Sequence, residues 1–252
     1  MNNEDALAKS FGENAYHYRI SNVFSDKDDL DRMIEIVNPK ESDIALDIAT
    51  GSGYTAIALS NYVKEVIAID IVENMLNQAS ILVQERKIKN ISLMKMDVHS
   101  LKFEDTYFDI ATCRFAPHHF YDISKALREI YRVLRQGGKL YILDCSVLNL
   151  EEAKSIINHI EKLRDPSHIK SYSLEEWKSM LKDQGFHIEY TRTIKTKYIL
   201  PEWFDRMNTP EKNRKHIFHI LENMPKHLKE FYDFNEEYIT TYYVELLAIK
   251  QT

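Results

Sequence analysis

A glycine-containing loop directly after an apolar run constrains the fold of this chain more than any other feature. Residues 44–53 read Ile-Ala-Leu-Asp-Ile-Ala-Thr-Gly-Ser-Gly and hold two of the chain's six glycines. Glycine is favoured where the backbone takes unusual dihedrals or lets a ligand approach closely. A helical pattern follows over residues 54–62. A buried strand, a glycine loop and a helix together predict a nucleotide site at the mouth of a parallel sheet.

Two classes of nucleotide fit this loop. Residues 51–56, Gly-Ser-Gly-Tyr-Thr-Ala, match the dinucleotide fingerprint G-x-G-x-x-G/A, and Asp70 lies near the expected distance downstream. An acid on the strand four positions before the glycine is instead typical of a methyltransferase loop, and Asp47 stands there. A carboxylate aimed into the loop is poorly suited to a pyrophosphate. It suits a ligand that carries an ammonium and a sulfonium.

Composition narrows the class of protein. A length of 252 residues suits one large α/β domain, and a net charge of -6 disfavours a nucleic-acid partner. The only cysteines are Cys113 and Cys145, so neither a disulfide framework nor a cysteine-based zinc site is expected. The N-terminus lacks the pattern of a secretory signal, and no apolar run approaches the ~18 residues of a membrane span. We therefore expect a soluble, cytoplasmic protein. No pattern specifies an oligomeric state.

Apolar runs alternate with helical patterns through the first 145 residues. The runs predict strands over 44–48, 66–70, 91–96, 108–113 and 139–144, the last preceded by a turn at 136–138. Helical spacing is found at residues 26–37, 54–62, 74–87 and 123–134. This alternation predicts a mainly parallel sheet wound on both faces, with ligands at the carboxyl ends of its strands. Three of these ends carry Asp47, Asp70 and Asp97.

The C-terminal part has a different pattern. Helices are expected over 151–164 and 173–184, the second capped by Ser173 with Glu176 three positions on. Strands are expected over 188–196 and 238–249, with the last one antiparallel. Residues 201–234, rich in charged and aromatic side chains, look helical. A helical insert between the last two strands predicts a cap near the carboxyl edge of the sheet.

Taken together, the motifs resemble the class I S-adenosylmethionine (SAM)-dependent methyltransferases. More narrowly, they resemble the small-molecule group related to the ubiquinone/menaquinone-biosynthesis C-methyltransferases. The resemblance covers roughly residues 11–145 and is carried by the segments 46–53, 68–70, 96–98, 108–113 and 132–138. Residues 113–120, with 164–168 and 203–208, are similar to a bacterial subgroup of methyltransferases. It implies a Rossmann-like single domain over 1–252. Residues 1–38 would form a helical lid, 39–145 the SAM-binding core, and 146–252 an acceptor-side half with the helical insert at about 201–235.

The resemblance also implies roles for individual residues. Asp47 would hold the methionine end of SAM, Asp70 the ribose hydroxyls, and Asp97 the adenine amino group. The other implied cofactor contacts come from loop backbone, strand ends and the lid: Ala49, Gly51, Gly53, Ile71, Val98, Cys113 and Tyr18. Ala49 stands where many members of the family have a glycine. The structural alternative for each acid is a cap on the helix that follows it.

Methyl transfer from a sulfonium is an in-line displacement, so the resemblance implies SAM as methyl donor and no metal. A general base is needed only if the nucleophile must lose a proton. His118 and His119 are the candidates, although either could only cap or pack the following helix. A two-histidine metal site is disfavoured because adjacent helical residues point in different directions. His168 and Arg206 are further candidates for ordering the acceptor, with a structural hydrogen bond as the alternative for each.

The leading hypothesis is methyl transfer to a small acceptor, aromatic or quinone-like. An RNA-modifying methyltransferase is the second, motivated by basic clusters at 195–197 and 212–215 but opposed by the acidic balance of the chain. A non-catalytic SAM-binding protein and an NAD-dependent oxidoreductase are the other two alternatives. The glycine loop indicates the methyl donor, and it carries no information about the acceptor.

Overall fold

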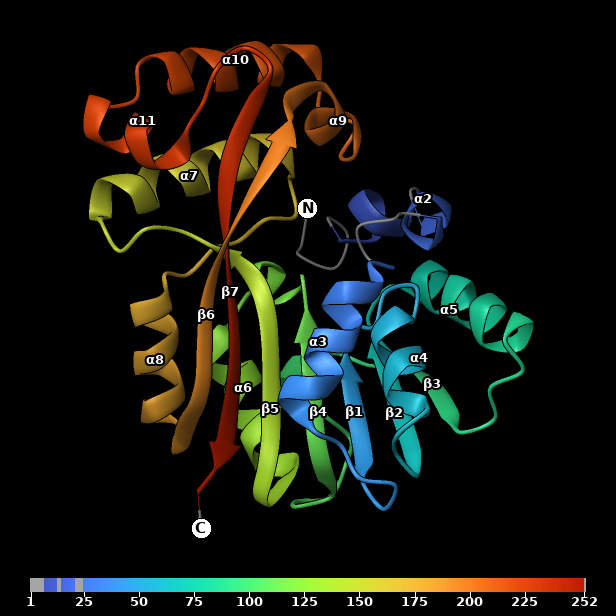
Figure 1. The fold of residues 1–252 in the computed structure, drawn as a ribbon. Coiled ribbons are helices and arrows are strands. Elements are labelled where there is room, and N and C mark those ends of the chain that lie inside the picture. The colour runs from blue at the N-terminus through green and yellow to red at the C-terminus, as the bar shows by residue number, and fades with distance from the viewer. Residues whose placement is uncertain (1–6, 13–14, 21–24, 252) are drawn as a thin grey trace.

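A seven-stranded mixed sheet forms the centre of the protein in the computed structural model, which describes residues 7–12, 15–20 and 25–251 (Figure 1). Its strand order is β3-β2-β1-β4-β5-β7-β6. The strands are β1 (Ile44–Ile48), β2 (Glu65–Asp70), β3 (Ile91–Lys95), β4 (Phe108–Arg114), β5 (Leu134–Ser146), β6 (Phe186–Ile199) and β7 (Tyr238–Lys250). β7 runs antiparallel to both of its neighbours, while β1 to β5 are parallel. The α/β class with an antiparallel last strand, predicted from the sequence, is confirmed.

The strand order reverses at β1, and this places a binding crevice. β1 pairs with β2 on one side and β4 on the other, with Asp47 opposite Ala68 and Thr112. The chain therefore leaves β1 and β4 in opposite directions along the sheet. In sheets of this kind the loops part at such a point and leave room for a ligand beyond the carboxyl ends of the strands.

Helices cover both faces of the sheet, which explains why the parallel strands are nearly continuous apolar runs. α3 (Lys27–Val37) and α4 (Tyr54–Ser60) bury Met33, Val37 and Leu59 against one face. α6 (Ile123–Val133) and α8 (Leu174–Asp183) pack on the other face. α5 (Glu73–Glu85) lies beside β3. α8 begins with the capping box that the sequence predicted, formed by Ser173 and Glu176.

A helical layer stands beyond the carboxyl ends of the strands (Figure 1). It contains α7 (Glu151–Arg164) and, between β6 and β7, α9 (Leu200–Asp205), α10 (Glu211–Glu222) and α11 (Lys226–Tyr232). The upper ends of β6 and β7 run into this layer. It has an apolar core of its own, which includes Trp203, Phe204, Leu221, Leu228 and Tyr232. We call this layer the cap.

The N-terminal segment packs where β2 ends. The short helices η1 (Ala8–Gly12) and α2 (Ala15–Arg19) lie against α5 (Figure 1). Leu7 and Ala15 form a small apolar cluster with Val72 and Met75. None of the described helices is long and apolar enough to cross a membrane.

One predicted turn lies inside a strand. The segment 136–138, expected to precede the fifth strand, belongs to β5, which begins at Leu134. Gly137 has a φ of 72°, and the register between β4 and β5 shifts between Phe108 and Ile110. The glycine pair therefore allows an irregularity within a continuous strand, because a positive φ is tolerated there without ending the pairing.

Gly53 and Gly137 both have a positive φ, but only Gly53 is crowded by a neighbouring residue. Alanine substitutions at the two positions therefore separate the free-energy cost of backbone strain from that of crowding. Gly53 has a φ of 88°, and a Cβ added there would lie 3.1 Å from the Ala79 Cβ on α5. A Cβ at Gly137 would meet nothing within 4 Å. We expect Gly137→Ala to lose about 1–2 kcal/mol of unfolding free energy from backbone strain alone, and Gly53→Ala to lose more. Urea unfolding measures both, and equal losses would contradict tight packing of α4 against α5.

Candidate active site

A cavity opens at the carboxyl ends of β1, β2 and β4. It encloses about 1060 Å³, its open mouth included. Its walls come from the loops after four strands and from the N-terminal segment. The lining residues include Leu7, Phe11, Asp47, Ala49, Gly51, Asp70, Ile71, Asp97, Val98, Arg114, Phe115, His119, Phe120 and Tyr121. Segments that are far apart in the sequence thus meet around one space, as the positions of the acids at the strand ends predicted.

The loop after β1 turns through left-handed backbone conformations. Ala49 has a φ of 53° and Gly51 a φ of 55°. A left-handed alanine is strained, so at Ala49 the surrounding structure holds a conformation that glycine would adopt freely. A Cβ at Gly51 would come within 3.4 Å of the Met75 Cε. The absence of a side chain at Gly51 keeps the loop backbone accessible to a ligand.

Asp70 at the end of β2 holds this loop through the backbone. Its Oδ2 accepts from the Gly51 N–H at 2.8 Å and its Oδ1 from the Val72 N–H at 2.9 Å. Burial raises the pKa of Asp70 to about 6, against the opposing effect of these hydrogen bonds. Each carboxylate oxygen can accept more than one hydrogen bond. Asp70 can therefore hold the loop and still accept from two hydroxyls of a ligand.

Asp47 on β1 is 1% exposed and accepts from two threonines. The Thr50 Oγ1 donates to its Oδ2 at 2.6 Å, and the Thr112 Oγ1 on β4 donates to its Oδ1 at 2.8 Å. Burial raises its pKa to about 6. A carboxylate in this position provides negative charge beside the glycine loop.

Asp97 both lines the cavity and caps a helix. It lines the cavity, and its Oδ1 also accepts from the His99 N–H at 2.9 Å, which caps the short helix η2 (Val98–Ser100). The His99 Nδ1 lies 2.6 Å from the same oxygen. The His99 ring stacks on Tyr121 with 3.7 Å between centroids. The carboxylate is thus fixed in place at the cavity wall.

Two of the predicted cofactor contacts lie outside the cavity lining, and the side chain of a third is not among the described residues. Gly53 and Cys113 are buried but do not belong to the cavity lining. The backbone of Tyr18 lies in α2, while its side chain is outside the described residues.

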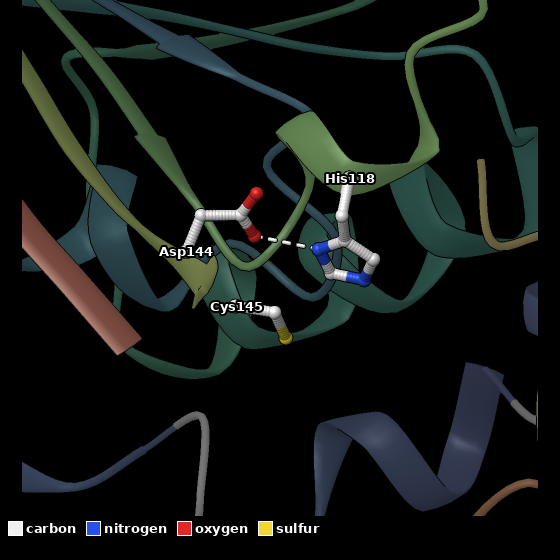
Figure 2. Close-up of side chains that lie close together, drawn as sticks. All are labelled: His118, Asp144 and Cys145. Carbon is white, nitrogen blue, oxygen red and sulfur yellow. Dashed lines mark hydrogen bonds and ion pairs between the residues drawn. The ribbon is translucent and has the colours of Figure 1, made fainter. Parts of the chain in front are cut away.

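The adjacent histidines have different surroundings. His118, in the short helix η3 (Pro117–His119), does not line the cavity, and its Nδ1 lies 2.6 Å from the Asp144 Oδ1 at the end of β5 (Figure 2). Burial alone would lower the pKa of His118, but the Asp144 carboxylate outweighs it and raises the pKa well above its usual value. His118 and Asp144 therefore form a buried ion pair.

His119 lines the cavity and is neutral. Its Nδ1 lies 3.2 Å from the Ser167 Oγ, its Nε2 3.9 Å from Asp165 Oδ2, and its ring 4.9 Å from the Phe11 ring, edge to face. Burial, reinforced by the charge of His118, lowers the pKa of His119 to about 3. His119 therefore contributes an uncharged ring to the cavity wall near neutral pH.

The other two predicted catalytic residues lie away from the cavity lining. His168 is buried, with its Nε2 2.9 Å from the Asn158 Oδ1, and burial lowers its pKa. Its ring lies 5.6 Å from that of His118. Arg206 belongs to the cap, where its guanidinium lies 4.9 Å from the centre of the Tyr198 ring.

Cys145 completes a set of metal-ligand atom types with His118 and Asp144 (Figure 2). Their ligand atoms all lie within 4.8 Å of one another. Two ligand atoms on one tetrahedral zinc ion are separated by about 3.3 Å, given bonds of ~2.0 Å. The 2.6 Å between His118 and Asp144 is instead a hydrogen-bond distance. The arrangement favours a shared proton over a shared ion.

Arg114 is a cavity residue to which sequence reasoning assigned no role. It ends β4 and is 8% exposed, and its Nη1 has a hydrogen bond to the Thr55 Oγ1 at 3.2 Å. Among the described residues, its buried Nε and Nη2 have no hydrogen-bond partner. The available signal in the sequence was a cation directly after an apolar strand, next to the segment that carries His118 and His119.

Three of the five cations in the basic clusters that motivated an RNA partner lie beside carboxylates. Lys197 lies 3.4 Å from Asp233, Lys215 lies 3.7 Å from Glu211, and the Arg214 Nη2 lies 2.7 Å from the Asp205 carboxylate. Such pairing reduces the positive charge available to a phosphate backbone.

Because Asp47 is buried, replacing its carboxylate with a neutral side chain should raise the free energy of unfolding, by an amount that depends on pH. A carboxyl whose pKa rises from 3.8 to about 6 on folding destabilises the folded state increasingly as pH rises through this window. The full cost above pH ~6 is about 3 kcal/mol. We expect Asp47→Asn, whose amide can pair with both threonine hydroxyls, to be more stable than the parent at pH 8 and equal to it near pH 4.

Urea unfolding between pH 4 and 8 measures this effect. Asp31→Asn, on the exposed face of α3, is the matched control and should change little at any pH. A loss of stability in Asp47→Asn that is the same at both ends of the pH range would contradict the prediction.

Comparison with known proteins agrees with this geometry. A family model described as a methyltransferase domain matches residues 46–142. YcgJ of Bacillus subtilis, named an uncharacterized methyltransferase, is 36% identical over 207 residues, which cover 82% of each chain. The crystal structure of YcgJ has a TM-score of 0.85 and 31% identity, and the match covers 88% of this chain and 98% of that one.

A more distant relative has an acceptor in its name. The demethylmenaquinone methyltransferase of Porphyromonas gingivalis is 33% identical over 144 residues, 54% of this chain and 59% of its own. The matched family domain contains most of β1, all of β2, β3 and β4 and most of β5, and with them the loop, Asp47, Asp70, Asp97 and Arg114. The chain belongs to the class I SAM-dependent methyltransferases.

Proposed function

We propose that this methyltransferase acts on a small, aromatic or quinone-like acceptor that binds against His119. The observation that carries the proposal is the ring-rich part of the cavity lining. Phe11, Phe115, Phe120 and Tyr121 line the cavity together with Asp47, Asp70 and Asp97, and the Phe11 ring lies edge to face with the His119 ring, 4.9 Å between centroids. A planar apolar molecule can pack against such rings.

The polar part of the cavity fits SAM by the chemistry of its donors and acceptors. Asp70 has acceptor capacity for two ribose hydroxyls, and Asp97 has an oxygen for the adenine amino group. Asp47 supplies negative charge for the ammonium of the methionine part. The open backbone at Gly51 leaves space for that part to lie against the loop. When bound, SAM supplies a methyl group that is already activated on a sulfonium.

The protein would then orient the acceptor relative to the methyl group and shield both from water. Aligning an acceptor with a reactive group can supply about 7–11 kcal/mol of barrier lowering. His119 would contact the acceptor through its ring, while Ser167 and Asp165, which face its two nitrogens, fix the orientation of that ring. Because its pKa is about 3, His119 would act mainly by positioning the acceptor near neutral pH. Leu7 and Phe11 cover part of the cavity and limit the access of water.

Two further observations favour a small acceptor over RNA. The chain has a net charge of -6, and Lys197, Arg214 and Lys215 of the basic clusters lie beside carboxylates. The N-terminal segment contributes to the cavity wall, which leaves less room for a macromolecular acceptor. The quinone-like class is supported by the relative named demethylmenaquinone methyltransferase, over about half of the chain.

Incubating the enzyme with a cell extract and methyl-labelled SAM tests the proposal. We expect the label in a low-mass aromatic compound, detected by untargeted mass spectrometry. His119→Ala should lower the rate of its formation by about tenfold or more, because an acceptor that loses this contact is less well aligned with the methyl group. SAM affinity, measured by calorimetry, should change by less than about threefold in the same variant, since the carboxylates are untouched.

His159→Ala, at an exposed position of α7, is the matched control and should keep the full rate. Label recovered in RNA or protein instead of small molecules would overturn the acceptor class. An unchanged rate in His119→Ala would remove His119 from the acceptor site.

A further inference from the structure

Arg114 is a buried cation that faces a ligand cavity with two of its nitrogens unpartnered. The side chain lines the cavity, and Nε and Nη2 are shielded from solvent without a hydrogen-bond partner. Burying an unpaired charge is costly, and buried guanidinium groups normally have carboxylate partners. The missing partner of Arg114 is therefore the feature to explain.

The neighbouring carboxylates are already engaged elsewhere. Glu245, fully buried, accepts from the Arg32 Nε at 3.0 Å and from the Tyr141 hydroxyl at 2.7 Å. Asp29 pairs with Arg32 at 2.6 Å. Both oxygens of Asp47 accept from threonines. Within the described part of the chain, no carboxylate forms an ion pair with Arg114, so the protein leaves its charge for another anion.

The backbone holds Arg114 in this position. Phe115, the next residue, has a φ of 54°, a left-handed conformation that is strained for an aromatic residue. Its N–H donates to the Leu143 carbonyl on β5 at 2.7 Å. On the other side, the Thr55 hydroxyl in the first turn of α4 anchors Nη1. The guanidinium is therefore fixed between β4 and α4 before any ligand binds.

Arg114 and Asp47 form a pair of opposite charges across neighbouring strands. Asp47 on β1 is in register with Thr112 on β4, and Arg114 lies two residues beyond Thr112, on the same face of the sheet. An anion and a cation side by side match the two charged groups of an α-amino acid. The methionine part of SAM has an ammonium and a carboxylate on one carbon atom.

We propose that Arg114 binds the α-carboxylate of SAM, while Asp47 faces the ammonium. This inference rests on the placement of SAM proposed above and deepens it by assigning the carboxylate subsite. A guanidinium can offer Nε and Nη2 as two parallel donors to one carboxylate, which is the geometry of a bidentate pair. Those are the two nitrogens of Arg114 that lack partners.

The decisive measurement compares SAM with decarboxylated SAM, which keeps the adenosine, the sulfonium and the ammonium. Calorimetry gives the dissociation constant of each compound for the wild-type protein and for Arg114→Gln. The wild-type protein should prefer SAM by about 10- to 100-fold, as expected for a charge-assisted pair. In Arg114→Gln the two compounds should bind with nearly equal affinity. Arg114→Lys should retain part of the preference, since it keeps the charge but not the planar fork.

The controls distinguish a loss of carboxylate binding at Arg114 from a loss of fold and from an effect of the acceptor. Arg128→Gln, at an exposed position of α6, should keep the wild-type preference, and circular dichroism checks the fold of each variant. A preference that persists in Arg114→Gln, or a wild-type protein that binds both compounds equally, would overturn the assignment. Binding is measured without acceptor, so an error in the proposed acceptor class leaves the result unaffected. If the wild-type protein bound neither compound, the placement of SAM itself would fall.

Discussion

The buried carboxylate of Asp47 is the constraint around which the site is built. It lies on β1, where the strand order reverses, and it joins the glycine loop to β4 through the hydroxyls of Thr50 and Thr112. Two hydroxyl donors do not fully replace the water lost on burial, so the pKa of Asp47 rises to about 6. A side chain that weakens the folded state at neutral pH is best explained by a ligand that uses its charge.

The same reasoning distinguishes two groups of buried charges near the crevice. His118 and Asp144 form an ion pair, with a hydrogen bond of 2.6 Å and no place in the cavity lining. Arg114 and Asp47 line the cavity, and among the described residues neither makes an ion pair. A charge of the first kind is balanced by the protein itself. A charge of the second kind, at the wall of a cavity, favours a charged ligand more clearly than residue type alone does.

Much of the fold followed from local pattern, because parallel strands buried on both faces are apolar runs that end at turn residues. The acids at the ends of β1, β2 and β3 could be placed at one edge of the sheet for the same reason. The roles of His118 and His119 could not be separated, because adjacent residues of a short helix point in different directions and only the packed structure shows which one faces the cavity. Arg114 was missed because its importance comes from a partner that it lacks, which no sequence pattern encodes.

The carboxylates of the cavity and the surroundings of His119 come from different parts of the chain. The carboxylates stand at the ends of consecutive strands, and short loops hold them within residues 46–142, the extent of the matched family domain. Around His119, Phe11 comes from η1, and Asp165 and Ser167 reach it from the loop after α7. Both of these segments lie outside residues 46–142, whereas Asp47, Asp70 and Asp97 lie inside them. The matched domain therefore contains the carboxylates of the cavity in full, but only part of the surroundings of His119.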